Sequence, residues 1–229
     1  KDFVVLTADR MASVGIHDHL GGGFSRYSTD QKWLVPHFEK MLYDNALLIQ
    51  LFSEVYQVSQ DEKYLEVLHK SIRYVLEEMT SPEGCFYSAE DADSEGEEGK
   101  YYIWTKREIL EILNDKTDAD VFCFYYGVTE GGNFEGKNIL NRQNNRTFLS
   151  QKFERPVHVI DDILRSSEEK LLEARKQRIH PGKDDKAITS WNSLMISALV
   201  KAYRVTSEET YLKAAVRAAD FIEARMSSP

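Results

Sequence analysis

The chain has 229 residues, 42% hydrophobic and 29% charged, which is the composition of an ordinary folded protein with one large domain. A formal net charge of −9 would repel nucleic acids and anionic membranes at long range, so neither is expected as a partner. No apolar stretch is long enough to span a membrane, and two cysteines, Cys85 and Cys123, are too few for a disulfide framework, so we expect a cytoplasmic protein.

The first predicted elements are a helix that stops before Gly21-Gly22-Gly23 and a glycine-rich, aromatic loop over residues 20–35. A long apolar helix over 36–58 follows, because Pro36 suits a first helical turn. The polar side chains that its first turn and a half would project are His37, Glu39, Lys40, Tyr43 and Asp44. These groups either contact a ligand or form a buried network that ties the helix to neighbouring loops.

A more charged helix is predicted over 61–80, after a very short turn. Its apolar stripe is narrow and consists of Leu65, Leu68, Ile72 and Leu76. The pattern Ser59-x-x-Glu62 is typical of a capping box that opens such a helix. The first helix would therefore be an inner helix and the second an outer one.

The long connection over 81–104 contains a run of acids bracketed by aromatic residues, which indicates a β-hairpin with a solvated tip. Glu90 and Asp91 are its candidate functional carboxylates. The spacing from Asp91 resembles the opening of a calcium-binding loop, but Tyr102 stands where that loop needs a bidentate glutamate. We therefore predict no metal site.

Weaker helical patterns follow at 105–113, 117–126 and 161–178, the first with a Thr105-x-x-Glu108 capping box. The glycine-rich stretch 131–138 lacks both phosphate-binding glycine patterns, so turn chemistry explains it. No nucleotide or other cofactor is expected.

The connection over 179–190 carries Asp184 and Asp185 shortly before a second apolar helix at 191–205. A charged helix at 208–226 follows, with the capping pattern Thr206-x-x-Glu209. The two carboxylates either contribute to a site or form salt bridges with neighbouring lysines.

An internal repeat relates the two helix pairs. Residues 45–82 align without a gap on residues 192–229, at a constant offset of 147, with eleven of the 38 positions identical. In an up-down array all connections of one kind emerge at the same end, so the long connections should share a rim beside the N-termini of the inner helices. The repeat thus predicts an arc of an α/α toroid with about eight helices in a single domain, residues 1–229.

Two carboxylates from different loops that converge on a cleft are what glycoside cleavage requires. If the reaction is an epimerisation instead, imidazole is the best general base because it ionises near neutral pH. The candidate catalytic residues are His37, Asp44, Glu90, Asp91, Asp184 and Asp185. The candidate substrate-binding residues are Arg26, Tyr27, Trp33, Lys40, Tyr43, Trp191 and Asn192.

Four stretches occur in a fixed order: GGGFSRYSTDQKWLVPHFEKMLYDN, FYSAEDADSEGEEGKYYIWT, GNFEGKNIL and DDKAITSWN. Over most of the chain they resemble the YyaL or spermatogenesis-associated thioredoxin-domain family. The resemblance implies an all-α, partial (α/α)6 toroid, similar to N-acylglucosamine 2-epimerases and six-hairpin glycosidases, with short β-hairpin loops on one rim. It also implies a thioredoxin-like domain that this chain lacks, and the chain reads as a piece of a longer protein.

Two hypotheses for the function follow. The first is a carbohydrate-binding or carbohydrate-active toroid that hydrolyses a glycoside or epimerises a sugar. The second is a non-catalytic scaffold whose rim docks the family's thioredoxin-like domain or another protein partner. Metal-assisted hydrolysis is a third, weaker alternative.

Overall fold

The computed structural model describes residues 2–226, with the side chain of Asp2 left out. Its helices are α1 (Asp2–Ser13), α2 (Leu42–Ser59), α3 (Glu62–Glu78), α4 (Lys106–Leu113), α5 (Lys116–Tyr125), α6 (Arg146–Lys152), α7 (Val157–Arg175), α8 (Thr189–Thr206) and α9 (Glu209–Arg225). Its strands are β1 (Tyr27–Ser28), β2 (Pro36–His37), β3 (Lys40–Met41), β4 (Ala89–Glu90), β5 (Asp93–Ser94), β6 (Glu97–Glu98) and β7 (Lys183–Asp184). Among the described helices, none has the length and hydrophobicity needed to cross a bilayer.

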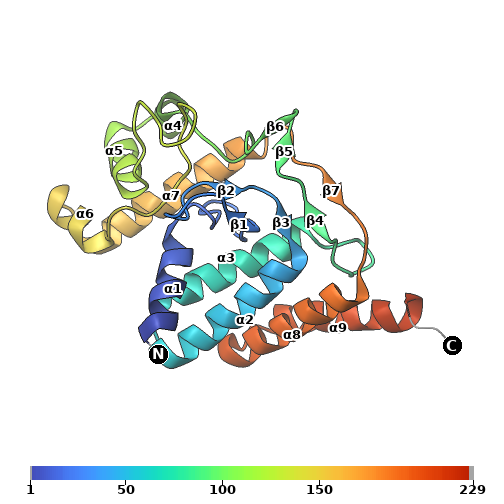
Figure 1. Ribbon diagram of the computed structural model, residues 1–229. Helices are drawn as coiled ribbons and strands as arrows, with labels where there is room; N and C mark the ends of the chain where they lie inside the picture. The colour runs from blue at the N-terminus through green and yellow to red at the C-terminus, as the bar shows by residue number, and fades with distance from the viewer. Residues whose placement is uncertain (1, 227–229) are drawn as a thin grey trace.

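Two antiparallel helical hairpins form the lower half of the molecule in Figure 1. Helix α2 packs on α3, α8 packs on α9, and the two apolar helices α2 and α8 pack against each other. Their shared core contains side chains without solvent exposure, such as Ile49, Phe52, Met195 and Leu199. The hairpin architecture predicted from the repeat is therefore confirmed, and the two repeat copies are neighbours in space.

The inner helix begins later than the sequence predicted. Residues that were expected in its first turn form β2 and β3, and α2 starts at Leu42. The reason is a competing partner for the backbone, because Lys40–Met41 pairs with Ala89–Glu90 and the Leu42 amide donates to the Ser88 carbonyl at 2.9 Å. His37 and Lys40 consequently lie on extended segments, and of the five polar candidates only Tyr43 and Asp44 lie on the helix.

The tight turns within the hairpins also differ from the prediction. Both inner helices end with a residue in the left-handed region, Gln60 with φ 55° and Ser207 with φ 61°, at equivalent positions of the repeat. The Ser59 hydroxyl bonds back to Val55 of its own helix, and Asp61 caps α3 instead. Of the three predicted capping boxes, the one at Thr105 forms.

Three long connections meet in one small antiparallel sheet with the strand order β3-β4-β7. Each strand comes from a different connection, and the sheet lies at the N-terminal ends of α2 and α8 (Figure 1). The predicted hairpin in 81–104 forms from β5 and β6, and its turn at Glu95-Gly96 is exposed. The connections thus share one rim, as the up-down arrangement required.

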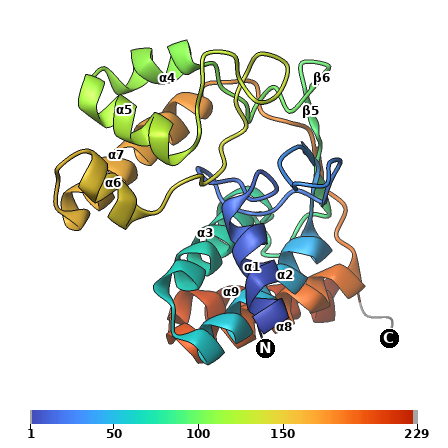
Figure 2. The same ribbon diagram turned by 60° about the vertical axis from the view of Figure 1, so that its left-hand side comes forward.

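The helices between the repeat copies form a second packed group, which stands beside the hairpins in Figure 2. Helix α7 packs against α4, α5 and α6 around a core of its own, in which Trp104, Phe122 and Leu171 are buried. Helix α6 was not predicted, because a helix of seven residues with one buried side chain, Leu149, leaves no periodic pattern.

A repeated asparagine ties two of the three long connections to the inner helices. Asn45 of α2 accepts a hydrogen bond from the Phe24 amide at 2.8 Å and donates to the Phe24 carbonyl at 3.1 Å. Asn192 of α8 does the same with Phe86, at 2.8 and 3.0 Å. Both asparagines are buried and also donate to a backbone carbonyl one turn earlier. Each amide therefore clamps a loop onto the start of a helix.

We expect Asn192→Ala to lower the free energy of unfolding by about 3 kcal/mol, because the buried amide and carbonyl of Phe86 would both lose their partner. Urea unfolding measures this loss. The matched control is Ser193→Ala, an exposed neighbour on the same helix that should change stability by less than about 0.5 kcal/mol. Equal effects of the two substitutions would contradict the clamp.

Candidate functional site

The register of the three-stranded sheet distributes the candidate residues over two faces. Lys40, Glu90 and Lys183 lie directly opposite one another, whereas Ala89 and Asp184 belong to the next row. Opposed residues share a face of a sheet, and successive residues of a strand point to opposite faces. The side chains of Glu90 and Asp184 therefore point to opposite sides of the sheet.

On the Glu90 side, a buried carboxylate binds two cations. Asp18 accepts hydrogen bonds from both terminal nitrogens of Arg175 at 2.8 Å and from Nζ of Lys40 at 2.9 Å. Burial alone would raise the pKa of Asp18, but the charges of Arg175 and Lys40 hold it well below its usual value. Asp18 is thus ionised in the folded protein and forms an ion triad with Lys40 and Arg175.

Aromatic rings and glycines close around the triad. Nζ of Lys40 lies 4.2 Å from the ring centre of Tyr74 and 4.8 Å from that of Tyr102. A Cβ atom on Gly21 would lie 2.1 Å from Nη2 of Arg175, and one on Gly23 would lie 2.4 Å from the Tyr74 ring. The glycine run is therefore needed for close packing around the charges.

Two cavities flank Tyr102 and Arg175, one towards His17 and one towards His180. Each has a volume of about 20 Å³, which is room for about one water molecule. The buried cluster on this side of the sheet is therefore too tightly packed to admit a sugar.

The other candidates form a more open set, which we call the rim group. Its members are Arg26, Tyr27, His37, Tyr43, Asp44 and Trp191. In the first part of this group, Arg26 bonds Glu39 at 3.1 Å, Nδ1 of His37 lies 2.7 Å from Oε1 of Glu98, and the His37 ring stacks on Tyr27. The imidazole thus has a carboxylate that orients it.

Asp44 is the rim-group residue with the most unusual environment. Burial raises its pKa to about 6, although the charge of Arg26 acts in the opposite direction. Its Oδ2 atom is buried and has no hydrogen-bond partner among the described residues. The neighbouring Tyr43 ring meets Trp191 of α8 edge to face, with 4.8 Å between ring centres. A carboxyl group with a pKa of about 6 therefore lies next to Tyr43, whose ring in turn contacts Trp191.

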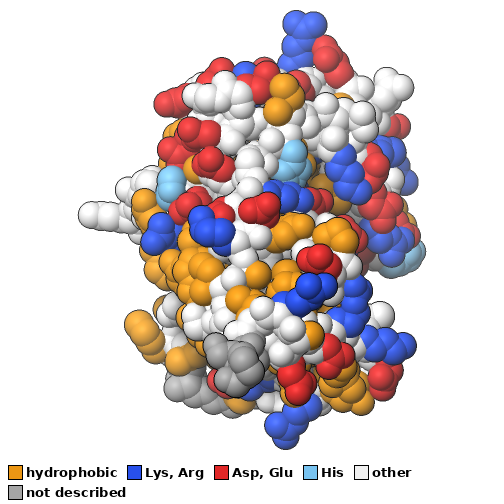
Figure 3. Space-filling model, turned by 90° about the vertical axis from the view of Figure 1, so that its right-hand side faces the viewer, with side chains coloured by type: hydrophobic (Ala, Val, Ile, Leu, Met, Phe, Trp, Pro, Cys, Tyr) orange, Lys and Arg blue, Asp and Glu red, His pale blue; other side chains and the backbone are white. Residues whose placement is uncertain are grey.

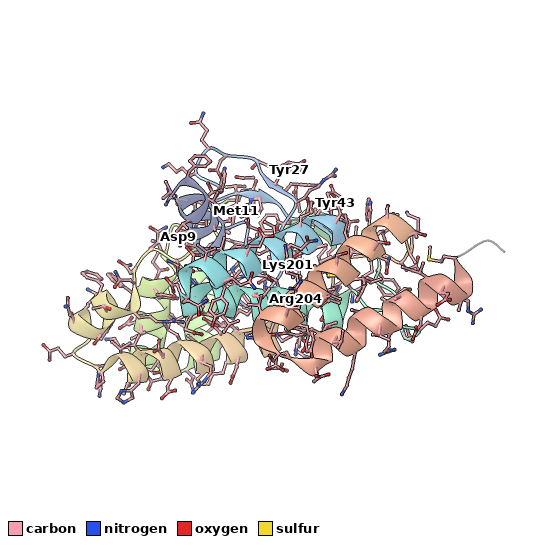
Figure 4. The ribbon with its side chains drawn as sticks, turned by 90° about the horizontal axis from the view of Figure 1, so that it is seen from below. Asp9, Met11, Tyr27, Tyr43, Lys201 and Arg204 are labelled. Atoms are coloured by element: carbon pink, nitrogen blue, oxygen red, sulfur yellow. The ribbon has the colours of Figure 1, made fainter. Side chains whose placement is uncertain are left out.

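Two residues of the rim group, Tyr27 and Tyr43, are labelled in Figure 4. Tyr27 and Tyr43 lie on the same side of the molecule, at β1 and at the first turn of α2, and Lys201 and Arg204 project from α8 (Figure 4). On the face shown in Figure 3, hydrophobic side chains gather at mid-height, with acidic and basic side chains above and below them. An apolar area bordered by charges is thus present on the face shown in Figure 3.

The remaining acidic candidates are more exposed. Asp184 pairs with Lys186 at 2.6 Å, and the hydrogen bond from that lysine lowers the pKa of Asp184. Asp185 is exposed and forms no salt bridge with any described residue. The Asp91 side chain is exposed, and its backbone amide donates to the Gly182 carbonyl.

Two candidate ligand-binding residues have mainly structural contacts. Trp33 adopts a left-handed backbone conformation, with φ 61°, and packs in part against the hairpin core. Asn192 is fully buried, with its amide group engaged by Phe86.

Sequence reasoning missed Asp18 and Arg175, together with the buried residues His17 and His19. Burial lowers the pKa of both histidines well below the usual value, so both are neutral. The available signal was the run His17-Asp18-His19, which only Leu20 separates from three glycines and which therefore places three titratable side chains where the backbone packs closely.

Antiparallel helical hairpins with long connections gathered at one rim define a mostly helical protein with the six-hairpin glycosidase-like toroid fold. A family 76 glycoside hydrolase from a bovine Bacteroides thetaiotaomicron strain aligns with 96% of this chain, at a TM-score of 0.50 and 13% identity. The chain covers 29% of that structure. This similarity concerns the fold alone.

Sequence comparison identifies relatives more specifically. Human spermatogenesis-associated protein 20 is 37% identical over 244 residues, and an uncharacterized protein of Caenorhabditis elegans is 35% identical over 249 residues. The matches include 96% and 97% of this chain but 31% and 34% of the relatives. The chain is therefore homologous to spermatogenesis-associated protein 20, as its motifs indicated, and spans about a third of the length of these relatives. No family model matches the chain.

Asp18→Asn tests the ion triad. At about pH 7 we expect a loss of about 3–5 kcal/mol in the free energy of unfolding, because Arg175 and Lys40 would remain buried without their counter-ion. The folded-state pKa of Asp18 is depressed, so its contribution is present above the unfolded pKa of about 3.9 and is lost as the pH falls below it. The difference between wild type and variant should therefore shrink in acid.

Urea unfolding at about pH 7 and about pH 3 measures both quantities. Asp162→Asn is the control, because Asp162 pairs with Arg165 on the exposed surface and should matter by less than about 1 kcal/mol. A difference for Asp18→Asn that stays constant with pH would contradict the assignment.

Proposed function

We propose that this part of the protein binds a mono- or oligosaccharide at the rim group and acts on it by acid/base chemistry. Asp44 carries the proposal, because its half-buried carboxyl group lies in the first turn of α2, next to Tyr43, and the Tyr43 ring contacts Trp191 in the first turn of α8. Aromatic rings stack on the apolar faces of sugars. A carboxyl group with a raised pKa donates a proton to a leaving oxygen.

The backbone supports a ligand at the same place. The N-caps of α2 and α8 are Met41 and Ile188, and within the described part of the chain neither helix has a side-chain hydrogen bond at its cap. The positive end of each helix dipole therefore favours an oxygen-rich or anionic group there. Sugar hydroxyls and a developing oxyanion are such groups.

Asp184 and Asp185 supply the second carboxylate in this proposal. Asp184 lies in the same sheet row as Met41, two strands apart, at about 10 Å by ordinary strand spacing. Asp44 lies in the first turn of α2, three residues after Met41, so it is near the sheet row that contains Met41 and Asp184. Asp185 is exposed and is the better candidate for a base or nucleophile, because Asp184 is paired with Lys186.

Epimerisation is the alternative reaction on the same ligand class. His37 would be the base, oriented by Glu98 at 2.7 Å, and Arg26 would polarise the carbonyl group. Product analysis distinguishes the two reactions, because hydrolysis releases a reducing sugar whereas epimerisation conserves the number of sugar units.

A second candidate function is a docking scaffold for a thioredoxin-like domain or another protein partner. It is favoured by the apolar residues Phe3 and Leu6 of α1, which are 79% and 60% exposed. The existing pairs of Arg26 with Glu39 and of His37 with Glu98 also suit a structural rim. Both cysteines are free, which fits the cytoplasmic location that we propose.

The ligand class is tested by thermal shift with a panel of mono- and oligosaccharides on the full natural chain. We expect at least one sugar to raise the melting temperature of the wild type, because a ligand that binds the folded state stabilises it by mass action. Trp191→Ala should abolish the shift. If no sugar stabilises the wild type, the sugar proposal is wrong and the scaffold is favoured.

Asp44→Asn separates function from stability. On any sugar that the protein converts, we expect turnover to fall by about 10²–10⁴-fold, as for the loss of a general acid. The substitution should raise stability at high pH although it lowers turnover. Ionising the partly buried Asp44 costs stability as the pH rises from about 4 through about 6. The melting temperature of Asp44→Asn minus that of the wild type should therefore increase between about pH 4 and about pH 8.

Asp220→Asn, an exposed change on α9, is the control and should leave turnover and melting temperature nearly unchanged. Full turnover by Asp44→Asn would exclude Asp44 as the acid.

A further inference from the structure

Another group of side chains meets on the Glu90 side of the sheet, away from the rim group. Nε2 of His180 lies 3.4 Å from Oε2 of Glu78 and 3.6 Å from Oε2 of Glu90. All three ligand atoms lie within 4.8 Å of one another. They come from the end of α3, from β4 and from the segment before β7, so the fold brings together residues that are far apart in the sequence.

We propose that Glu78, Glu90 and His180 bind one divalent transition-metal ion, with zinc as the best fit. Bonds of about 2.0–2.1 Å in a tetrahedron put neighbouring ligand atoms about 3.3–3.5 Å apart. The two distances from His180 are close to that value. Two carboxylates would also neutralise the charge of the ion. The sequence predicted no metal site, because these residues show no ligand spacing along the chain.

Each ligand is oriented by a further contact, as is usual around protein-bound zinc. Nδ1 of His180 lies 3.0 Å from the Pro181 carbonyl, so it donates there and leaves the lone pair on Nε2. The Tyr102 hydroxyl donates to Oε1 of Glu90 and leaves Oε2 free. Nζ of Lys183 bonds Oε2 of Glu78 at 2.8 Å, and this half-exposed lysine has room to turn to solvent when an ion binds.

Two buried polar atoms at the cluster make no hydrogen bond within 3.5 Å to any described residue. They are Oε2 of Glu90, a residue that is 1% exposed and has Nε2 of His180 at 3.6 Å, and the hydroxyl of Tyr74, which is 3% exposed. Burial raises the pKa of Tyr74, and the charge of Glu90 adds to this effect. Unpaired buried groups of this kind cost free energy. Glu90, Tyr74 and His180 line the same cavity of about 20 Å³. A metal ion bound to Oε2 would satisfy the Glu90 carboxylate, and the cavity has room for about one water molecule as a fourth ligand.

The competing explanation is a protonated His180 that bridges the two carboxylates without any metal. Isothermal titration of the untagged, EDTA-treated full natural chain with zinc chloride decides between them. We expect one zinc ion per chain. His180→Ala and Glu78→Gln should each weaken binding at least tenfold, whereas His158→Ala and Glu169→Gln, exposed changes on α7, should leave it unchanged.

Three outcomes would overturn the proposal. The first is that the wild type binds no zinc in this titration, and the second is that His180→Ala and Glu78→Gln both bind zinc as tightly as the wild type does. The third is that His158→Ala weakens binding as much as His180→Ala does, which would indicate binding at the surface. Glu78 is half-exposed, so Glu78→Gln decides the matter if His180→Ala does not fold. Cobalt provides a spectroscopic check, because a four-coordinate site gives intense visible absorption and a six-coordinate site does not. This test needs no substrate and is independent of the proposed activity on sugars.

Discussion

The carboxylate of Asp18 is the contact on which the arrangement of the chain depends. It joins the loop after α1 to β3 through Lys40 and to the end of α7 through Arg175, a residue 157 positions away in the sequence. All three charges are buried. A buried ion pair adds little net stability but is very costly to break, so it strongly disfavours alternative arrangements of these segments. The pairing of Asp18 with Lys40 thereby fixes β3, the edge strand of the three-stranded sheet.

Further charge pairs join α3 to the α4–α7 group. Glu66 binds Arg142 at 2.7 Å, Lys70 binds Glu168 at 2.6 Å, and the Tyr126 hydroxyl donates to Glu168. Burial acts to raise the pKa of Glu66, but the surrounding cations lower it to about 2. Charged contacts are therefore prominent between the two helical groups, whereas each group has its own hydrophobic core. Directional contacts of this kind determine orientation more than they add stability.

The features that sequence predicted well are those with a local pattern. The repeat around Asn45 and Asn192 identified the hairpins, and the order of short and long connections placed the loops on one rim. The start of α2 was misplaced because Pro36 is compatible with a helical turn, while the strand that competes for this segment comes from Ala89–Glu90. Asp18 could not be assigned, since its partner Arg175 lies on a helix whose position depends on tertiary packing. Site residues paired across such distances leave no trace in periodicity.

The side-by-side packing of α2 and α8 has a consequence for the order of folding. Equivalent residues of these helices are separated by 147 positions, so their contact closes a very long loop, whereas each hairpin closes a short one. Chain entropy favours the short closures first. The α4–α7 group, which has its own core, shortens the effective loop once it has collapsed. The packing of α2 against α8 should then be among the last contacts to form. The sheet β3-β4-β7 should form at the same stage, because β3 and β4 flank the first hairpin and β7 directly precedes α8.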